Sequence, residues 1–222
     1  MAVQAGLNHF EWDMRCEKAD DFEGLLMWWG TLRGPAVPPG MYSVELAVDE
    51  DTLKTTFEIL MDPRSEGTQE DRVAQFNFLK AVRDKVDETH DAIRHMRATR
   101  SQISALIERL EKEEHLELFE ASGALDSSMV AIEEVLYQRK LKSNQDMLNY
   151  PIKLNNKLAH VGSLASMGIY RPTDQMEGVR QDISAKIDEA LNKWYALRDE
   201  QLPEFNALIR SSNIEFIEAP QD

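Results

Sequence analysis

Histidine and acidic residues are the first side chains to consider for metal binding or catalysis. His90 and His95 are five residues apart, which places them about 140° apart around a helix, so they cannot hold one metal from a single helical face. A second set of potential metal ligands lies close together in the chain: Glu113, Glu114, His115 and Glu117. These residues fall at the expected end of a helix among other charges, where a solvated helix terminus is a better interpretation than a zinc site. We therefore predict neither a metal site nor a cofactor.

No nucleophile or acid–base pair is evident either. Cys16 is the only cysteine, which excludes an internal disulfide and leaves the redox compartment open. It has no neighbouring histidine or helix start in the sequence to activate it. The acidic triplet at residues 49–51 has no glycine-containing ligand loop around it, so it is better interpreted as a solvated turn than as a calcium loop. Carboxylate pairs are weak evidence for glycosidase chemistry in so acidic a chain, and we predict that the chain is not an enzyme.

Two groups of side chains are candidates for binding. Trp28 and Trp29 lie between two glycines, Gly24 and Gly30, and could form a flat platform for sugar rings; alternatively they close the open end of a small sandwich. The second group consists of Asn155, Asn156 and Lys157. On a buried helical face an asparagine can set the register of a bundle by bonding to a neighbouring helix; the alternative is a ligand-binding role.

The charge of the chain limits its partners. It has 25 basic and 40 acidic residues and a formal net charge of −15, which argues against nonspecific binding to nucleic acid or to an anionic membrane. No apolar run is long enough to span a bilayer, and the start has no signal-like pattern. The sequence by itself therefore gives no localisation.

The longest regular pattern runs from Thr68 to about Lys112. This stretch has no proline or glycine, and its apolar residues recur every three or four positions once Thr89 and Arg100 are included. A helix of about 45 residues would be roughly 70 Å long, too long for a globular core. It must therefore bury its apolar stripe against other long helices.

Two further legs of similar length follow. We expect a broken return path with a turn at residues 121–123 and a restart at Pro151, and then a last helix from Thr173 that Pro203 kinks or ends. Each leg has an apolar stripe, which predicts a long antiparallel three-helix coiled-coil bundle over residues 68–210. Residues 211–222 remain as a C-terminal tail.

The first sixty residues have strand-like patterns instead. Residues 7–14 alternate so that Phe10 and Trp12 would point into a core, and residues 41–48 and 52–60 form two further strand candidates around the acidic turn. We therefore expect residues 1–62 to form a small β-domain, which makes the chain an α+β protein.

Several motifs in this order resemble a known family. They are Gly6-Leu7-Asn8-His9-Phe10-Glu11-Trp12-Asp13-Met14-Arg15, Trp28-Trp29-Gly30, Pro39-Gly40-Met41-Tyr42-Ser43-Val44, Asp62-Pro63-Arg64, residues 149–158 and residues 171–175. They are similar to the C-terminal region of bacterial sortilin-like, BNR-repeat "glycosyl hydrolase" proteins. The resemblance implies a partial Ig-like antiparallel β-sandwich, with too few strands for a complete one. No Asp-box motif is present, so the propeller of that family is not in this sequence.

Three hypotheses follow about function. The first is a non-catalytic structural or interaction module, the C-terminal accessory part of a larger sortilin-like protein, with the propeller as its partner in cis or in trans. The resemblance then implies a periplasmic or other extracytoplasmic location, and missing strands would leave a sheet edge exposed for self-association. The second is a carbohydrate-binding accessory domain that uses Trp28 and Trp29. The third is a fragment of a glycoside hydrolase, whose chemistry would belong to the absent propeller.

Overall fold

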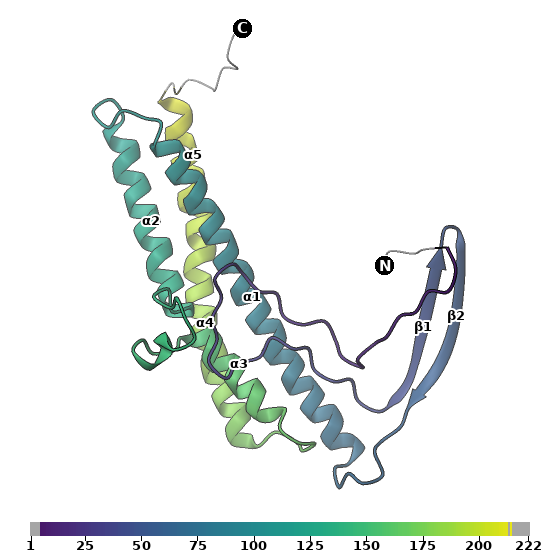
Figure 1. The fold of residues 1–222 in the computed structure, drawn as a ribbon. Helices are drawn as coiled ribbons and strands as arrows, with labels where there is room; N and C mark the ends of the chain where they lie inside the picture. Colours follow the sequence, from purple (N-terminus) through teal and green to yellow (C-terminus); the bar gives the residue numbers. More distant parts are fainter. Residues whose placement is uncertain (1–4, 213, 215–222) are drawn as a thin grey trace.

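The computed structural model describes residues 5–212 and residue 214, so most of the expected C-terminal tail lies outside the described residues. Two strands come first, β1 (Gly40–Val48) and β2 (Asp51–Ile59). The helices that follow are α1 (Gln69–Ile107), α2 (Leu116–Leu136), a 3₁₀ turn η1 (Asp146–Leu148), α3 (Leu154–Ala165), α4 (Asp174–Ala196), a π-helical turn η2 (Leu197–Gln201) and α5 (Leu202–Ser211). Figure 1 shows an elongated helical bundle with a hairpin beside it.

The helices form three antiparallel legs. The first leg is α1, the second returns through α2, η1 and α3, and the third runs through α4, η2 and α5 (Figure 1). α1 packs against α2, α3 and α4, and α2 also packs against α4 and α5. The helical bundle that the sequence predicts is therefore present.

The first leg begins as its sequence predicts. Thr68 caps α1, because its hydroxyl accepts a hydrogen bond from the Asp71 amide while the Asp71 carboxylate accepts one from the Thr68 amide. This reciprocal pair satisfies two N–H groups at the helix start. The predicted stripe is buried along the middle of α1, at Val82, Val86, Thr89, Ile93 and Met96.

The core lies along the whole length of the bundle. Its fully buried apolar side chains come from all three legs: Ile93, Met96, Leu118, Met129, Leu136, Leu158, Ile187, Leu191, Trp194 and Leu197. Gly162 of α3 faces α1, and a Cβ atom at this position would come within 2.9 Å of Val82 Cγ1. Glycine at this position lets the two helices pack closely.

Two boundaries in the second leg differ from the expectation. Gly123 lies inside α2 on its exposed side, not in a turn, and α2 begins earlier, at Leu116. Burial of Leu118, Ser122 and Leu125 on the other side outweighs the helix-breaking cost of one exposed glycine, about 1 kcal/mol. α3 begins at Leu154 and not at Pro151, and the Pro151 carbonyl oxygen accepts a hydrogen bond from the Gln138 side chain.

The Ig-like β-sandwich is wrong. The described residues form one sheet of two antiparallel strands, β1 and β2, in a mostly helical protein. Residues 7–14 are not a strand, and Phe10 is 70% exposed instead of buried. Alternation shows which side chains share a face but does not supply a partner strand. Within residues 5–212 the nearest β pairing is an isolated bridge just after the segment, between Arg15 and Ala36.

The two strands themselves are confirmed. Their register pairs Tyr42 with Phe57 and Leu46 with Leu53, and Asp49 takes a positive φ of 53° at the tip, as tight hairpin turns require. Trp12 packs against the hairpin base, with its ring centroid 6.0 Å from Tyr42 and 6.3 Å from Phe57.

The last leg passes its proline without a break. The Leu202 amide donates to the Leu197 carbonyl oxygen, five residues back, which makes the wider π turn just before Pro203. Pro203 then occupies the first turn of α5, where a missing N–H is tolerated. The expected kink is a local π bulge in a continuous leg.

Substitutions in α3 test the position of the core. Leu158 is fully buried, whereas Leu164 on the same helix is 39% exposed. We expect Leu158→Ala to lower the free energy of unfolding by about 2–5 kcal/mol and Leu164→Ala by less than about 1 kcal/mol, measured by urea denaturation. Equal losses would contradict the orientation of α3.

Candidate functional site

The residues considered for metal binding do not meet. His90 is buried in the bundle, His95 is exposed on the same helix, and residues 113–115 lie in the loop between α1 and α2. Cys16 is half-buried, and its amide donates to the Pro35 carbonyl oxygen. Within the described part of the chain, no group of three His, Cys, Asp or Glu side chains could hold a metal ion.

The bundle instead holds an irregular segment across its surface. We call residues 19–30 the strap. In Figure 1 the purple N-terminal chain crosses the bundle and returns toward the hairpin. Ala19 and Phe22 of the strap are buried in the core. The strap is neither helix nor strand, so its backbone polar groups need partners from elsewhere.

Helix α1 supplies many of these partners from one row of side chains. Asp87 accepts a hydrogen bond from the Asp20 amide at 2.7 Å, and His90 Nδ1 lies 2.6 Å from the Asp20 carbonyl oxygen. Arg94 donates to the Asp21 carbonyl and Arg97 to the Glu23 carbonyl. The four residues are spaced by three, four and three, which places them on one face of the helix.

The second leg supplies further partners. The Tyr137 hydroxyl donates to the Gly24 carbonyl oxygen and accepts from the Leu26 amide. Asn156 holds Trp28 from both sides: its Oδ1 accepts from the Trp28 amide at 2.7 Å, and its Nδ2 donates to the Trp28 carbonyl at 2.8 Å.

The predicted polar cluster is thus divided between core and surface. Asn155 and Asn156 are buried, whereas Lys157 is exposed. Asn155 reaches α1, where its Nδ2 lies 3.3 Å from His90 Nε2. Asn155 Oδ1 also accepts from the Asn156 amide within α3. The bonds that these asparagines make to other elements run to α1 and to the strap, and their proposed effect on the register of the bundle stays a prediction.

His90 is held as a neutral imidazole by its surroundings. Nδ1 faces the Asp20 carbonyl, which can only accept, so Nδ1 carries the proton and Nε2 accepts from the Asn155 amide. Burial lowers the pKa of His90 below its ordinary value, and Arg94 lowers it further, against the opposing effects of the Asp20 carbonyl, Asp87 and Asp21.

A buried carboxylate fixes the strap near its middle. Glu133 on α2 is fully buried, and its Oε1 lies 2.9 Å from Arg97 Nε and 2.8 Å from Arg97 Nη2. Arg100 and Arg139 approach its other oxygen at 3.7 Å. Arg97 also stacks over the Phe22 ring at 4.7 Å. Glu133 therefore orients the arginine that binds the strap, and its own charge is compensated by three guanidinium groups.

The two predicted platform residues lie at the end of the strap. Trp28 is half-buried and Trp29 is 67% exposed. Their rings stack with centroids 6.4 Å apart and planes 23° apart, and His160 lies edge-on to Trp29. Trp29 has a φ of +55°, a left-handed conformation that is uncommon for a bulky residue.

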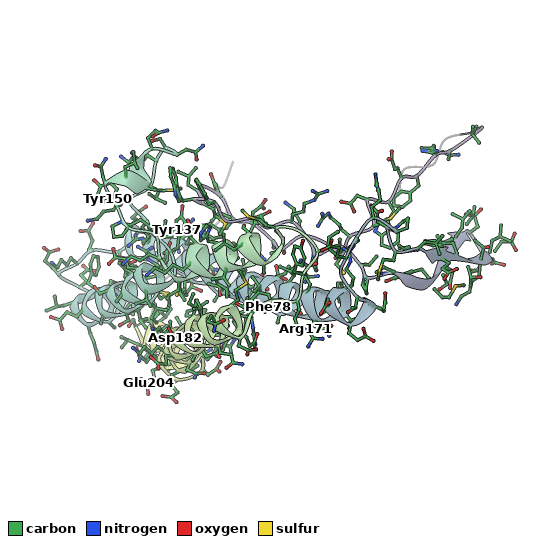
Figure 2. All side chains as sticks on the ribbon, turned by 90° about the horizontal axis from the view of Figure 1, so that it is seen from below. Phe78, Tyr137, Tyr150, Arg171, Asp182 and Glu204 are labelled. Atoms are coloured by element: carbon green, nitrogen blue, oxygen red, sulfur yellow. The ribbon has the colours of Figure 1, made fainter. Side chains whose placement is uncertain are left out.

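The hairpin is the most exposed element of the structure. Neither strand packs along a helix among the described residues, and Figure 2 shows the hairpin extending beyond the bundle, past Arg171. One of its faces is largely apolar, and its exposed apolar members are Val44, Leu46, Val48, Leu53 and, at 37% exposure, Phe57. The opposite face is mostly polar, with Ser43 opposite Thr56 and Glu45 opposite Lys54.

The sequence interpretation missed the row on α1. Its signal was available, because Asp87, His90, Arg94 and Arg97 repeat with a helical period beside the apolar stripe. The strap itself has no regular spacing of polar or apolar residues, so its position on the bundle could not be predicted in this way.

Comparison of the chain with protein-family models, with curated proteins and with solved structures gives no match. None of the helices in residues 5–212 is both long enough and apolar enough to cross a membrane. Function must therefore be argued from the geometry.

The buried His90 predicts how stability depends on pH. The unfolded chain takes up a proton on this histidine near pH 6.5, whereas the folded protein, in which the pKa of His90 is lowered, takes it up only at lower pH. Stability is therefore retained above about pH 6.5 and falls as the pH decreases below it.

We expect His90→Gln to reduce the loss of unfolding free energy between pH 7.5 and pH 5.5, measured by urea denaturation. Glutamine can still donate to the Asp20 carbonyl and accept from Asn155. His95→Gln, on the exposed side of the same helix, is the control and should keep the loss of the unmodified protein. The same loss in the His90 variant would show that this imidazole is not held neutral.

Proposed function

We propose that this protein is a non-catalytic structural and interaction module, in which the helical bundle carries the hairpin as an arm for binding a partner protein. The observation that supports the proposal most directly is the apolar face of the hairpin, where Leu46 is 51% exposed and Leu53 is 70% exposed. A two-stranded hairpin alone is at best marginally stable in water. A partner that covers this face would stabilise it by burying the apolar side chains.

The base of the hairpin is held firmly enough to present the arm. The Tyr42 hydroxyl donates to the Pro38 carbonyl at 2.6 Å, and the Gln69 side chain at the start of α1 donates to the Pro39 carbonyl at 2.7 Å. Trp12 covers Tyr42 and Phe57. No other part of residues 5–212 covers the apolar side chains nearer the tip in this way, so within that range the free surface begins where these contacts end.

The resemblance of the motifs to sortilin-like proteins supports a propeller of the Asp-box type as the partner, in cis or in trans, and with it a periplasmic or other extracytoplasmic location. A second copy of this chain is the other proposed partner, because both outer edges of the hairpin are unpaired in the described structure and can add a further strand.

A double substitution on the hairpin tests the interaction proposal. We expect Leu46→Ser with Leu53→Ser to weaken binding to a purified Asp-box propeller at least tenfold, measured by surface plasmon resonance, because both side chains leave the apolar face. The same variant should reduce self-association in sedimentation velocity experiments.

Met41→Ser is the matched control, because Met41 is an exposed apolar residue on the opposite face. It should leave both measurements unchanged. If the unmodified protein neither binds the propeller nor self-associates, the hairpin is not an interaction arm of this kind.

A second candidate function is carbohydrate binding at Trp28 and Trp29. The observation that favours it is the left-handed backbone of an exposed Trp29, because such a conformation in a bulky residue is often kept for a functional reason. The two hydrogen bonds from the Asn156 side chain fix the backbone of Trp28, the neighbour of Trp29. The indole rings of Trp28 and Trp29 therefore form a preorganised aromatic surface.

Sugar titrations test this alternative. We expect a bound oligosaccharide to change the tryptophan fluorescence and Trp29→Ala to reduce affinity at least tenfold, through loss of the exposed ring. Trp12→Phe, at the hairpin base, is the control and should retain binding. A glycan array and titrations without any response would reject the carbohydrate function and leave the hairpin proposal untouched.

A further inference from the structure

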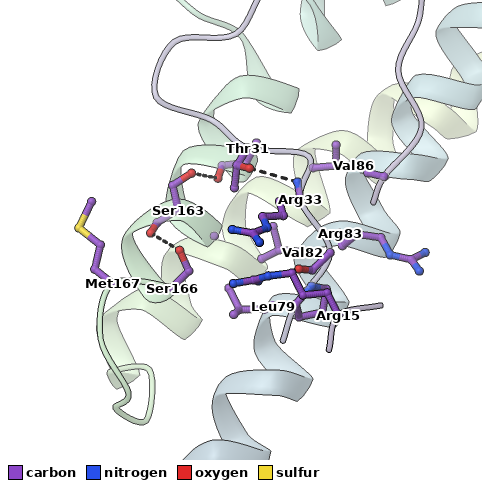
Figure 3. Close-up of a pocket in the computed structure, with 15 residues that line it drawn as sticks. Arg15, Thr31, Arg33, Leu79, Val82, Arg83, Val86, Ser163, Ser166 and Met167 are labelled. Atoms are coloured by element: carbon purple, nitrogen blue, oxygen red, sulfur yellow. Dashed lines mark hydrogen bonds between the residues drawn. The ribbon is translucent and has the colours of Figure 1, made fainter. Parts of the chain in front are cut away.

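A cavity lies where α1, α3 and the N-terminal segment meet. Its volume is about 470 Å³, within the range of small-molecule sites in proteins. Residues of α1 and α3 form two walls, and the chain on both sides of the strap forms the third. Figure 3 shows this arrangement.

The interior of the cavity is apolar. Its walls include Leu79, Val82 and Val86 from α1 and Ala159 and Gly162 from α3. Leu79 is half-buried, whereas Val82, Val86 and Ala159 have almost no exposed surface. Hydroxyl groups of Thr31, Ser163 and Ser166 lie at the edge. Such a surface suits a ligand with an apolar body.

Two arginines lie at the opening. Figure 3 shows Arg15 and Arg33 over the space between α1 and α3, whereas the guanidinium of Arg83 points away from it. Arg15 donates through Nη1 to the Gly34 carbonyl oxygen at 3.0 Å. Arg33 has an ion pair with Asp13 at 3.7 Å, where both side chains are mostly exposed. A guanidinium has five N–H donors, so both arginines keep donors for a ligand.

The charge at this opening is opposite to that of the chain as a whole. The net charge of the sequence is −15, yet the described residues that line the cavity include three arginines and no carboxylate. Arg83 is already paired with Asp84 at 3.0 Å. Asp13, which is not among these lining residues, lies 3.7 Å from Arg33 and offsets part of its charge. Arg15 and Arg33 supply the positive charge that remains for a ligand.

We propose that this cavity binds an organic carboxylate with an apolar body. The carboxylate would bind the guanidinium groups of Arg15 and Arg33, because planar guanidinium and carboxylate groups pair through two parallel hydrogen bonds. The apolar body would lie against Leu79, the half-buried apolar side chain of the α1 wall. The proposal does not depend on the hairpin as an interaction arm.

Isothermal titration calorimetry with sodium octanoate tests the site on the full chain. Octanoate should bind with one-to-one stoichiometry. 1-Octanol, which has the same apolar body without the charge, should bind at least tenfold more weakly, as should acetate, which has the charge without the body. Higher salt should weaken octanoate binding because the arginines are near the surface.

Two variants locate the binding. Arg33→Gln should weaken octanoate binding about tenfold or more, the scale of one lost charge-assisted hydrogen bond. Ser163→Leu should abolish it by filling the cavity from α3. Arg109→Gln, at the far end of the bundle on the loop after α1, should leave it unchanged, and circular dichroism should show that all three variants are folded.

Three results would overturn the proposal. Octanoate that does not bind would show that the cavity is not a carboxylate site. If 1-octanol bound as tightly as octanoate, the carboxylate group would not contribute to binding; if acetate did, the apolar body would not contribute. Equal effects of Arg33→Gln and Arg109→Gln would show that the ligand responds to the overall charge of the protein and not to this opening.

Discussion

The structure depends on finding hydrogen-bond partners for a partly buried stretch of backbone that belongs to no helix or sheet. Unpaired backbone groups away from water cost about as much as a lost hydrogen bond, and the strap places several of them on the bundle. One face of α1 supplies hydrogen-bond partners for these backbone groups, from Asp87, His90, Arg94 and Arg97. The same helix thus has two stripes, an apolar one that holds the bundle together and a polar one that holds the strap.

The strap connects the bundle to the hairpin and to the cavity. Its two ends run back together, since the Ala19 amide donates to the Leu32 carbonyl and the Cys16 amide to the Pro35 carbonyl. Gly34 allows this close pairing, because a Cβ atom there would come within 1.9 Å of the Cys16 carbonyl oxygen. The paired ends place Arg15 and Arg33 at one wall of the cavity and then lead to β1. Anchoring the strap therefore also determines where the arginines and the arm emerge.

The parts of the fold that could be predicted from the sequence are those in which apolar residues recur at a regular spacing. The stripe through Val86 and Ile93 required a long helix with partners, and the alternation in residues 41–48 and 52–60 predicted the two strands β1 and β2. The sandwich could not be predicted correctly, because the alternation around Phe10 carries no information on a partner strand. Gly123 was misinterpreted because its local preference is weaker than the burial around it. The cavity combines residues from three distant segments, and no local pattern in the sequence brings Arg33 next to α3.

The π turn in the last leg has a consequence for the phase of the helix. One additional residue in a turn rotates everything after it by about 100°. In an uninterrupted helix the seam through Trp194 and Leu197 would continue at Gln201 and place polar side chains against α2. With the added residue it continues at Leu202 and Phe205, which pack into the core. The single additional residue thus keeps the apolar seam of the third leg packed against its neighbouring helices, although the spacing of its residues in the sequence changes by one. The leg accommodates this change within the helix and needs no loop.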